Sequence, residues 1–293
     1  MSPHERVNQR RAGLRVAGLA LLCLTLISGC TAQFLYNRLN YLIPWYLSGQ
    51  VSLDDAQEAE LKSAITSLTA WHRSSQLGRY SAFMRSLAAE IAQPVTREQI
   101  ERASHTIEGF WVDIIRELTP EAARWLQSLS PSQVDELLAS FAEDDEDSRD
   151  EECVAPSEKQ AARRVKSITR AVKYWAGTLD DTQSELVAAA AKDLRPTGCD
   201  WLESRARWRD QLKRALSATA DAQARDESVR ALLLDPRPTW TQAYRSGFEA
   251  NRSRIIDLMA SLDATWSGEQ RKAIQGRLTK LAGDLEELAK ASP

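Results

Sequence analysis

The chain has 293 residues and a formal net charge of −3, with acidic residues slightly outnumbering basic ones. This balance, together with the lack of a clustered basic face, excludes nucleic acid as an expected partner. Glycine accounts for only 12 residues, and residues that favour helices dominate the composition. Strand signals are nearly absent, so the sequence predicts an all-α fold, a multi-helix antiparallel bundle of about ten helices.

The first 29 residues have the three parts of an export signal. Four arginines give a positive start, and residues 16–27 form an uncharged apolar run that is too short to cross a bilayer. Ser28 and Gly29 then come directly before Cys30, as in a lipoprotein signal, where the cysteine thiol takes a diacylglycerol before cleavage after Gly29. We therefore expect a signal peptide at 1–29, a lipidated Cys30, and a helical body behind this tether. The alternative, a buried cysteine in an ordinary N-terminal helix, does not explain why all three parts agree.

The residue after Cys30 is Thr31. In Gram-negative bacteria an aspartate at this position usually retains a lipoprotein on the inner membrane. Its absence favours attachment to the outer membrane, facing the periplasm. The expected partners are this membrane, through the lipid, and an unidentified envelope protein or glycan.

Residues 30–50 form an aromatic-rich segment directly after the expected lipid. One interpretation is that this segment docks on the protein's own core. The other is that it lies in the bilayer interface, where Tyr41, Trp45 and Tyr46 are favourably placed. We favour docking, because a simple tether needs no apolar content. The remaining residues, 51–293, are expected to form an all-helical domain, which is either one large unit or two coupled units with a boundary near 143–156.

A local pattern recurs along the helical domain, a Ser, Thr or Asp followed three residues later by Gln. It is typical of a capping box, in which the short side chain accepts from the first-turn backbone N–H and the glutamine reaches back. The pattern begins at Asp54, Thr96, Ser130, Asp180 and Ser267. From these starts and from the prolines, we expect helices near 55–73, 76–92, 97–117, 120–127, 131–142, 157–178, 181–193, 197–220, 226–234, 239–264 and 268–290.

The segment 143–152 is dominated by acidic residues. A run of like charges is most simply a solvated loop. It lacks the glycine and the alternating ligands of a calcium-binding loop, so the sequence does not favour a cation site there. Whether the segment binds a cation stays open.

Two cysteines, Cys153 and Cys199, remain after the signal and Cys30 are set aside. In an oxidising compartment an even pair is typical of a disulfide, although two free thiols remain the alternative. Their spacing does not indicate a metal site, and we expect no cofactor.

Two groups of residues are candidates for an interaction surface: Trp71, His72 and Arg73, and then Trp201, Arg205 and Trp208. Trp201, Arg205 and Trp208 share one helix face, and exposed aromatic and arginine side chains bind peptide or glycan. The alternative for the tryptophans is that most are core anchors. For His72 it is a partly buried side chain bonded to a backbone or carboxylate group. Known catalytic motifs are missing, so no catalytic residue is expected.

Several short motifs together resemble a family of uncharacterised Gram-negative outer-membrane lipoproteins. The resemblance is carried by the lipobox cysteine, by Phe34–Leu39, by Pro44–Leu47, by Val51–Asp54, and by Trp71–Arg73 followed by Leu77–Tyr80. It implies an outer-membrane location and an all-helical fold, and no activity. Gly78 departs from the pattern, since proline is common there, which puts a bend between the flanking helices in doubt.

The Leu-Thr-x-x-Gln helix starts are also similar to those of Spy-like periplasmic chaperones, which are small helical dimers. A capping box explains the motif equally well. We therefore expect a lipoprotein with a non-catalytic binding or structural role in the envelope. An envelope glycan hydrolase and a chaperone-like binder of unfolded proteins are the alternatives.

Overall fold

The computed structural model describes residues 35–217 and 221–290. The described residues form helices and contain no strand, which confirms the all-α prediction. None of these helices is long and apolar enough to cross a bilayer. The predicted signal peptide, Gly29 and Cys30 lie outside the described residues.

The helices follow one another with short connections. In chain order they are α3 (Leu39–Ser48), α4 (Asp55–Trp71), the π-helix η1 (His72–Gln76), α5 (Leu77–Glu90), α6 (Arg97–Ser128), α7 (Pro131–Arg149), the π-helix η2 (Asp150–Val154), α8 (Ser157–Ala176), α9 (Asp181–Asp193), α10 (Gly198–Ser217), α11 (Ala222–Leu234), the short 3₁₀ helix η3 (Arg237–Thr239), α12 (Gln242–Asp263) and α13 (Gly268–Lys290).

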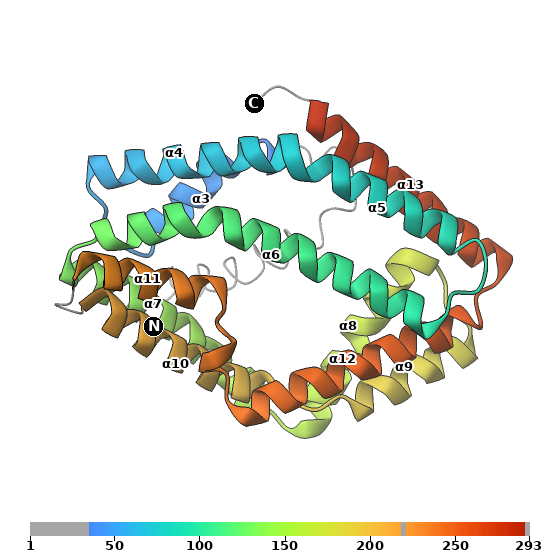
Figure 1. Cartoon of the computed structure of the whole chain (residues 1–293). Helices are drawn as coiled ribbons and strands as arrows, with labels where there is room; N and C mark the ends of the chain where they lie inside the picture. Colours follow the sequence, from blue (N-terminus) through green and yellow to red (C-terminus); the bar gives the residue numbers. More distant parts are fainter. Residues whose placement is uncertain (1–34, 218–220, 291–293) are drawn as a thin grey trace, which may run out of the picture.

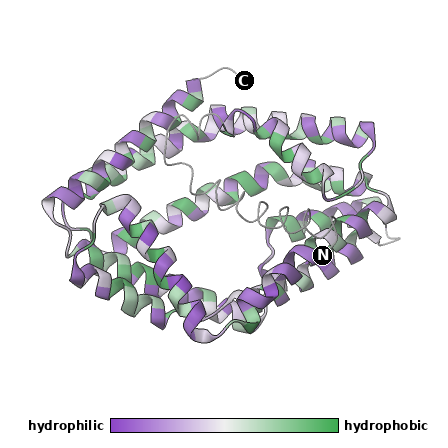
Figure 2. Cartoon of the chain, turned by 180° about the vertical axis from the view of Figure 1, so that it is seen from behind, coloured by the Kyte–Doolittle hydropathy of each residue, from purple (hydrophilic) through white to green (hydrophobic). Residues whose placement is uncertain are grey.

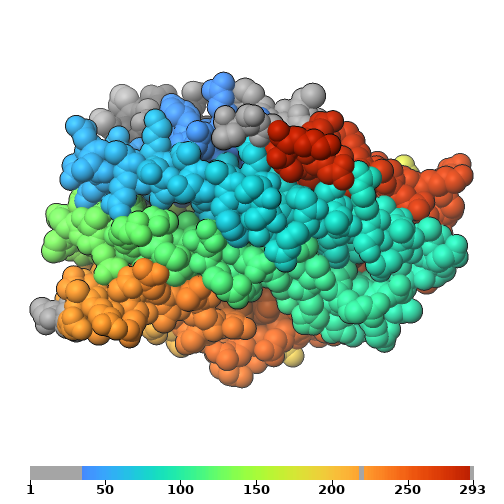
Figure 3. All heavy atoms as spheres, turned by 45° about the horizontal axis from the view of Figure 1, so that its top comes forward, coloured from blue at the N-terminus to red at the C-terminus, as the bar shows by residue number. Residues whose placement is uncertain are grey.

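α6 extends across the molecule from one end to the other (Figure 1). α4, η1 and α5 join end to end along one side, and α6 runs beside them, as the space-filling view also shows (Figure 3). α7, α10 and α11 gather at one end of α6, and α8, α9 and α12 at the other. Seen from behind, each helix carries both polar and apolar residues, as an amphipathic bundle requires (Figure 2).

The apolar core has separate clusters near the two ends. At one end, Leu61 of α4, Trp125 of α6, Leu137 of α7 and Leu212 of α10 are buried together. At the other, two smaller clusters join α5 with α13 and α9 with α12, and Trp266 packs against both. Residues on both sides of 143–156 therefore contribute to the first cluster, since α10 and α11 pack there with α4, α6 and α7.

All five predicted capping boxes form. Asp54, Thr96, Ser130 and Asp180 each accept from the backbone N–H three residues on, and the glutamine there accepts from the N-cap N–H. Ser267 and Gln270 make the same two bonds, at 3.1 and 3.0 Å. The signal is local in sequence, which is why it locates these helix starts correctly.

Four of these boxes are joined in pairs through their glutamines. The Gln57 and Gln133 amides donate to each other's oxygen at 3.0 and 2.6 Å, which holds the starts of α4 and α7 together. Gln183 and Gln270 do the same at 2.9 and 2.8 Å for α9 and α13. Each amide also donates to the backbone carbonyl two residues before its partner's N-cap: Ser128, Ser52, Thr265 and Thr178.

The same hydrogen-bond pattern thus occurs twice, once in each half of the chain. Gln183 is fully buried and Gln57 is 7% exposed. Buried amides of this kind are stable only when their donors and acceptors are satisfied, and the pairing satisfies them. The paired boxes therefore fix the register of two helix starts at once.

At two places the structure joins helices that we predicted as separate. The break expected between 117 and 120 is absent, because α6 continues through Pro120 to Ser128. The Thr119 hydroxyl donates to the Ile115 carbonyl at 2.6 Å in this turn, and both parts of α6 pack on other helices. At 72–76, the chain continues as a π-helix instead of a new helix start.

The acidic segment was predicted as a solvated loop. It is helical, so the loop part of this prediction is wrong, whereas most of its carboxylates, such as Glu146 and Asp147, are exposed. Residues 143–149 complete α7 and residues 150–154 form η2. The reason is Asp145, which is 3% exposed and forms ion pairs with Arg205 and Arg209 of α10. Two arginines from a distant helix therefore balance part of the acidic charge and dock the segment on the bundle.

The disulfide between Cys153 and Cys199 is present, as predicted, with a Cα–Cα distance of 5.0 Å. It joins η2 to the first turn of α10. The bond therefore fastens the end of the acidic segment to the same helix that carries the arginines bound to Asp145.

The tryptophans divide between core and surface. Trp125 is 6% exposed, as expected of a core anchor, whereas Trp45 and Trp111 are more than 60% exposed. In the middle of α6, Ile107 and Val112 are also about half exposed. The middle of α6 therefore exposes several apolar side chains, whereas Ile100 and Trp125 near its two ends are buried.

Candidate functional site

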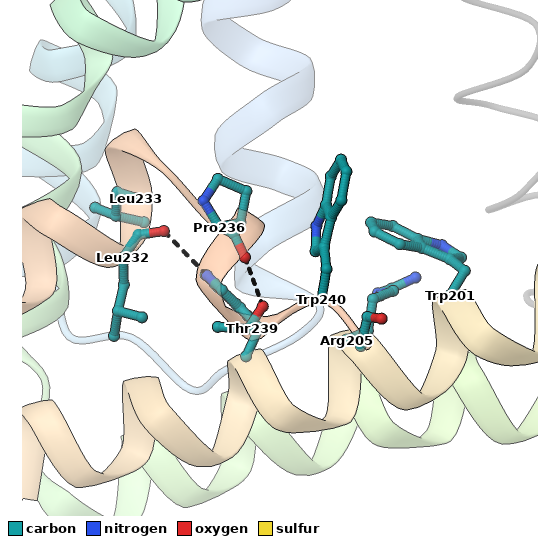
Figure 4. Close-up of a pocket in the computed structure, with 9 residues that line it drawn as sticks. Trp201, Arg205, Leu232, Leu233, Pro236, Thr239 and Trp240 are labelled. Atoms are coloured by element: carbon teal, nitrogen blue, oxygen red, sulfur yellow. Dashed lines mark hydrogen bonds between the residues drawn. The ribbon is translucent and has the colours of Figure 1, made fainter. Parts of the chain in front are cut away.

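The second predicted group, Trp201, Arg205 and Trp208, lines a hollow between α10 and the connection from α11 to α12. This hollow, which we call the aromatic cleft, has a volume of about 220 Å³ (Figure 4). Its lining consists of Trp201, Ser204, Arg205 and Trp208 of α10, with Leu232, Leu233, Pro236, Thr239 and Trp240. The structure thus brings the three predicted residues together and adds apolar side chains from a second element.

The polar side chains of the aromatic cleft are already bonded within the protein. The Ser204 hydroxyl donates to the Asp200 carbonyl at 2.8 Å and accepts from the Thr241 backbone N–H at 3.1 Å. The Thr239 hydroxyl donates to the Pro236 carbonyl at 2.7 Å. These groups shape the wall and are not available to a ligand.

The Trp208 and Arg205 side chains are held by their own partners as well. The Trp208 indole N–H donates to the Leu232 carbonyl at 3.2 Å, which closes the α10–α11 side of the cleft. The Arg205 guanidinium forms an ion pair with Asp145 at 2.9 Å and lies over the Trp201 ring at 5.9 Å. Among the described residues, no acceptor is found for the indole N–H groups of Trp201 and Trp240, which therefore remain available at the rim.

An array of aromatic rings extends the cleft along α12. The Tyr244 ring lies 4.8 Å from that of Trp240 and 5.3 Å from that of Trp201, and the Phe248 ring lies 5.3 Å from that of Trp240. Burial raises the pKa of the Tyr244 phenol, so this side chain stays neutral. Trp201 and Phe248 are 39% and 43% exposed, so the aromatic rings form an apolar surface that is open to solvent.

Sequence reasoning missed the α12 part of this site. Trp240 precedes α12 directly, and Tyr244 and Phe248 lie on it. The intervals of four residues between them place all three on one face of the predicted helix 239–264. This spacing was a usable signal. No sequence signal placed Leu232 and Leu233 in the cleft, because their position depends on how the C-terminal end of α11 packs on α10.

The first predicted group, Trp71, His72 and Arg73, lies at η1 on the other side of α6 from the aromatic cleft (Figure 1). Here residues of the N-terminal segment contact the helical bundle. The Tyr36 hydroxyl bonds to Nδ1 of His72 at 2.9 Å, and the Arg73 guanidinium donates to Oδ1 of Asn37 at 3.0 Å. Arg73 also donates to the Leu288 carbonyl at 2.7 Å, which ties η1 to α13.

Burial controls the ionisation of the Tyr36 and His72 side chains. It raises the pKa of the Tyr36 phenol to about 12, against the opposing effect of Arg73. Burial lowers the pKa of His72, and the positive charge of Arg73 lowers it further. Because His72 is therefore neutral and Tyr36 protonated at pH 7, Tyr36 donates and the imidazole accepts. His72 thus has the structural role of anchoring the N-terminal segment.

The described part of the N-terminal segment, from Leu35 onwards, is docked on the protein, as we expected. Ile43 and Leu47 of α3 pack against the first core cluster, and Tyr36 and Asn37 bind η1. The two predicted groups therefore do different things. One fastens the segment that follows Cys30, and the other forms a surface hollow.

Residues 49–245 match the model of a family described as a family of unknown function (DUF6279). The chain belongs to the DUF6279 family. This confirms that it is a member of an uncharacterised family. No curated protein and no solved structure matches the chain.

The region that matches DUF6279 contains η1 and the whole lining of the aromatic cleft, and it ends within α12. Tyr244 lies inside the matched region, whereas Phe248 and α13 lie beyond it. α3 precedes it. The aromatic cleft is therefore built from the part of the chain that defines the DUF6279 family.

Proposed function

We propose that this DUF6279 protein is a lipid-anchored binding protein of the outer membrane, facing the periplasm, whose aromatic cleft seats an apolar side chain of a partner polypeptide. The anchor is inferred from the signal-like N-terminus and Cys30. The binding role is inferred from the aromatic cleft, in which the exposed Trp201 and the half-buried Trp208 and Trp240 line a hollow whose polar side chains are already bonded.

The mostly apolar lining of the cleft favours a polypeptide over a glycan. A sugar offers many hydroxyl groups, and binding it requires free donors and acceptors around an aromatic platform. Ser204, Thr239 and Arg205 are held by other protein groups, so the floor offers apolar contact instead. The indole N–H groups of Trp201 and Trp240 are placed to bind a backbone carbonyl of such a partner.

The site is less suited to a glycan hydrolase, which remains the alternative. A general acid there would be a carboxyl group whose pKa is raised by apolar walls. Among the described residues that line the cleft none is acidic, and the carboxyl groups with a shifted pKa have it lowered. For example, the Arg79 guanidinium lowers the pKa of Asp113, and Ser81 and Arg85 lower that of Glu286.

A chaperone-like role is a second candidate, because the middle of α6 exposes Ile107, Trp111 and Val112 to solvent. An exposed apolar stretch of this kind binds unfolded clients with little selectivity. This reading predicts many partners at α6, whereas the aromatic cleft predicts one or a few. The same experiment separates them.

We expect Trp240→Ala to lower partner capture at the aromatic cleft by at least about tenfold, because truncating a central aromatic residue removes a large share of binding energy. In intact cells, a photoreactive phenylalanine analogue replaces Phe248 at the rim, or Trp111 on α6 as the matched exposed control. The expected result is a discrete polypeptide adduct from position 248 that Trp240→Ala removes.

Thermal unfolding of the Trp240→Ala variant serves as the folding control. An adduct from position 248 that persists in Trp240→Ala, or one that consists of glycan, contradicts the proposed site. Many adducts from position 111 and none from 248 favour the chaperone-like reading instead.

A further inference from the structure

α3 has two different faces. Its inward face packs on the first core cluster through Ile43 and Leu47. On the opposite side, Tyr41 and Trp45 are 63% and 64% exposed and lie one helical turn apart. We call Tyr41 and Trp45, with the exposed Asn40 and Ser48, the outer face of α3.

The outer face of α3 differs from the rest of the surface in charge. Charged residues make up 27% of the chain, yet α3 contains none over its ten residues. Elsewhere the helices expose charged side chains to water. A helix that presents aromatic side chains without any charge is suited to a less polar environment than bulk water.

The position of α3 along the chain indicates the membrane as the partner of its outer face. Cys30 lies five residues before Leu35, where the described chain begins, so the two Cα atoms are at most about 18 Å apart. Tyr36 and Asn37 are hydrogen-bonded to η1, so only the few residues between Cys30 and Tyr36 separate the lipid from the helical domain. An acylated Cys30 therefore keeps α3 close to the headgroup region.

From these observations we propose that the outer face of α3 rests on the membrane that carries the anchor, with Tyr41 and Trp45 in the lipid headgroup region. This inference rests on the proposed lipid anchor at Cys30. Tyrosine and tryptophan favour this zone, because the ring is apolar and the hydroxyl or indole N–H binds water and headgroups. The sequence interpretations of docking and of bilayer contact then both apply, one to each face of α3.

The contact also orients the protein. α3 packs on α4, and in Figure 1 α10 and α12 lie on the other side of α6 from this pair. With α3 on the membrane, the bilayer contact and the aromatic cleft use different helices, since α3 does not line the cleft.

The test uses the lipidated chain, extracted from membranes and reconstituted in vesicles of phosphatidylethanolamine and phosphatidylglycerol with brominated acyl chains. Bromine quenches tryptophan at bilayer depth. Trp45→Leu is compared with Trp111→Leu, because Trp111 is 62% exposed and lies on α6. We expect quenching to fall at least about twofold in Trp45→Leu and to stay unchanged in Trp111→Leu.

A second variant guards against a change in folding. Adding Tyr41→Trp to Trp45→Leu returns a tryptophan to the outer face of α3 and is expected to restore the quenching. Equal quenching in Trp45→Leu and Trp111→Leu, with the protein still bound to vesicles, overturns the α3 contact alone. A wild-type chain that does not associate with vesicles at all overturns the anchor, and the contact with it.

Discussion

Gln183→Ala is expected to lower the free energy of unfolding by about 3–5 kcal/mol, because several buried groups lose their partners together. Gln183 is fully buried and bonds the Gln270 amide, the Thr265 carbonyl and the Asp180 backbone N–H. Alanine leaves these groups buried and unsatisfied. Urea unfolding followed by far-ultraviolet circular dichroism measures the loss.

Gln99→Ala is the matched control for this change. Gln99 completes the capping box of Thr96, but its box has no glutamine partner among the described residues. Its removal is expected to cost about 1 kcal/mol or less. In the double variant Gln183→Ala/Gln270→Ala, the second change should cost much less than it does alone. Equal losses from Gln183→Ala and Gln99→Ala would show that the pairing adds nothing.

Removing the disulfide is expected to cost about 4 kcal/mol, because the bond restricts the unfolded chain over its 46-residue separation. The variant is Cys153→Ser/Cys199→Ser. It should unfold at lower urea concentration than the wild type, and the wild type with a reductant should behave like the variant. Each single Cys→Ser change should match the double change, since one sulfur cannot form the bond.

Thiol labelling under denaturing conditions provides the control for the disulfide. Two free thiols in the untreated wild-type protein would mean that the cysteines are not bonded. The same midpoint with and without reductant would show that the bond does not stabilise the fold.

Features that depend on neighbours in sequence were predictable for this chain. A capping box needs only a residue and its third successor, so five helix starts follow directly from the sequence. The pairing of these boxes was not predictable, because Gln57 and Gln133 meet only when two helices approach in space. The disulfide was predictable from cysteine number and expected compartment.

The errors have a common physical cause, which is a long-range contact that overrides a local pattern. The acidic segment is helical because Arg205 and Arg209 reach Asp145 from α10. The candidate site also depends on contacts between residues that are far apart in the sequence. The face of Trp201 and Trp208 was visible from their spacing, but the approach of Leu232, Leu233 and Trp240 to this face was not, since these residues come from separate elements.

The proposal of a membrane-anchored binding protein depends first on Cys30. Intact mass spectrometry of the chain extracted from membranes tests it directly. We predict a mature N-terminus at Cys30 carrying acyl chains, with residues 1–29 removed. A chain that keeps its first residues, or an N-terminal Cys30 without acyl groups, would contradict the anchor and the membrane contact of α3.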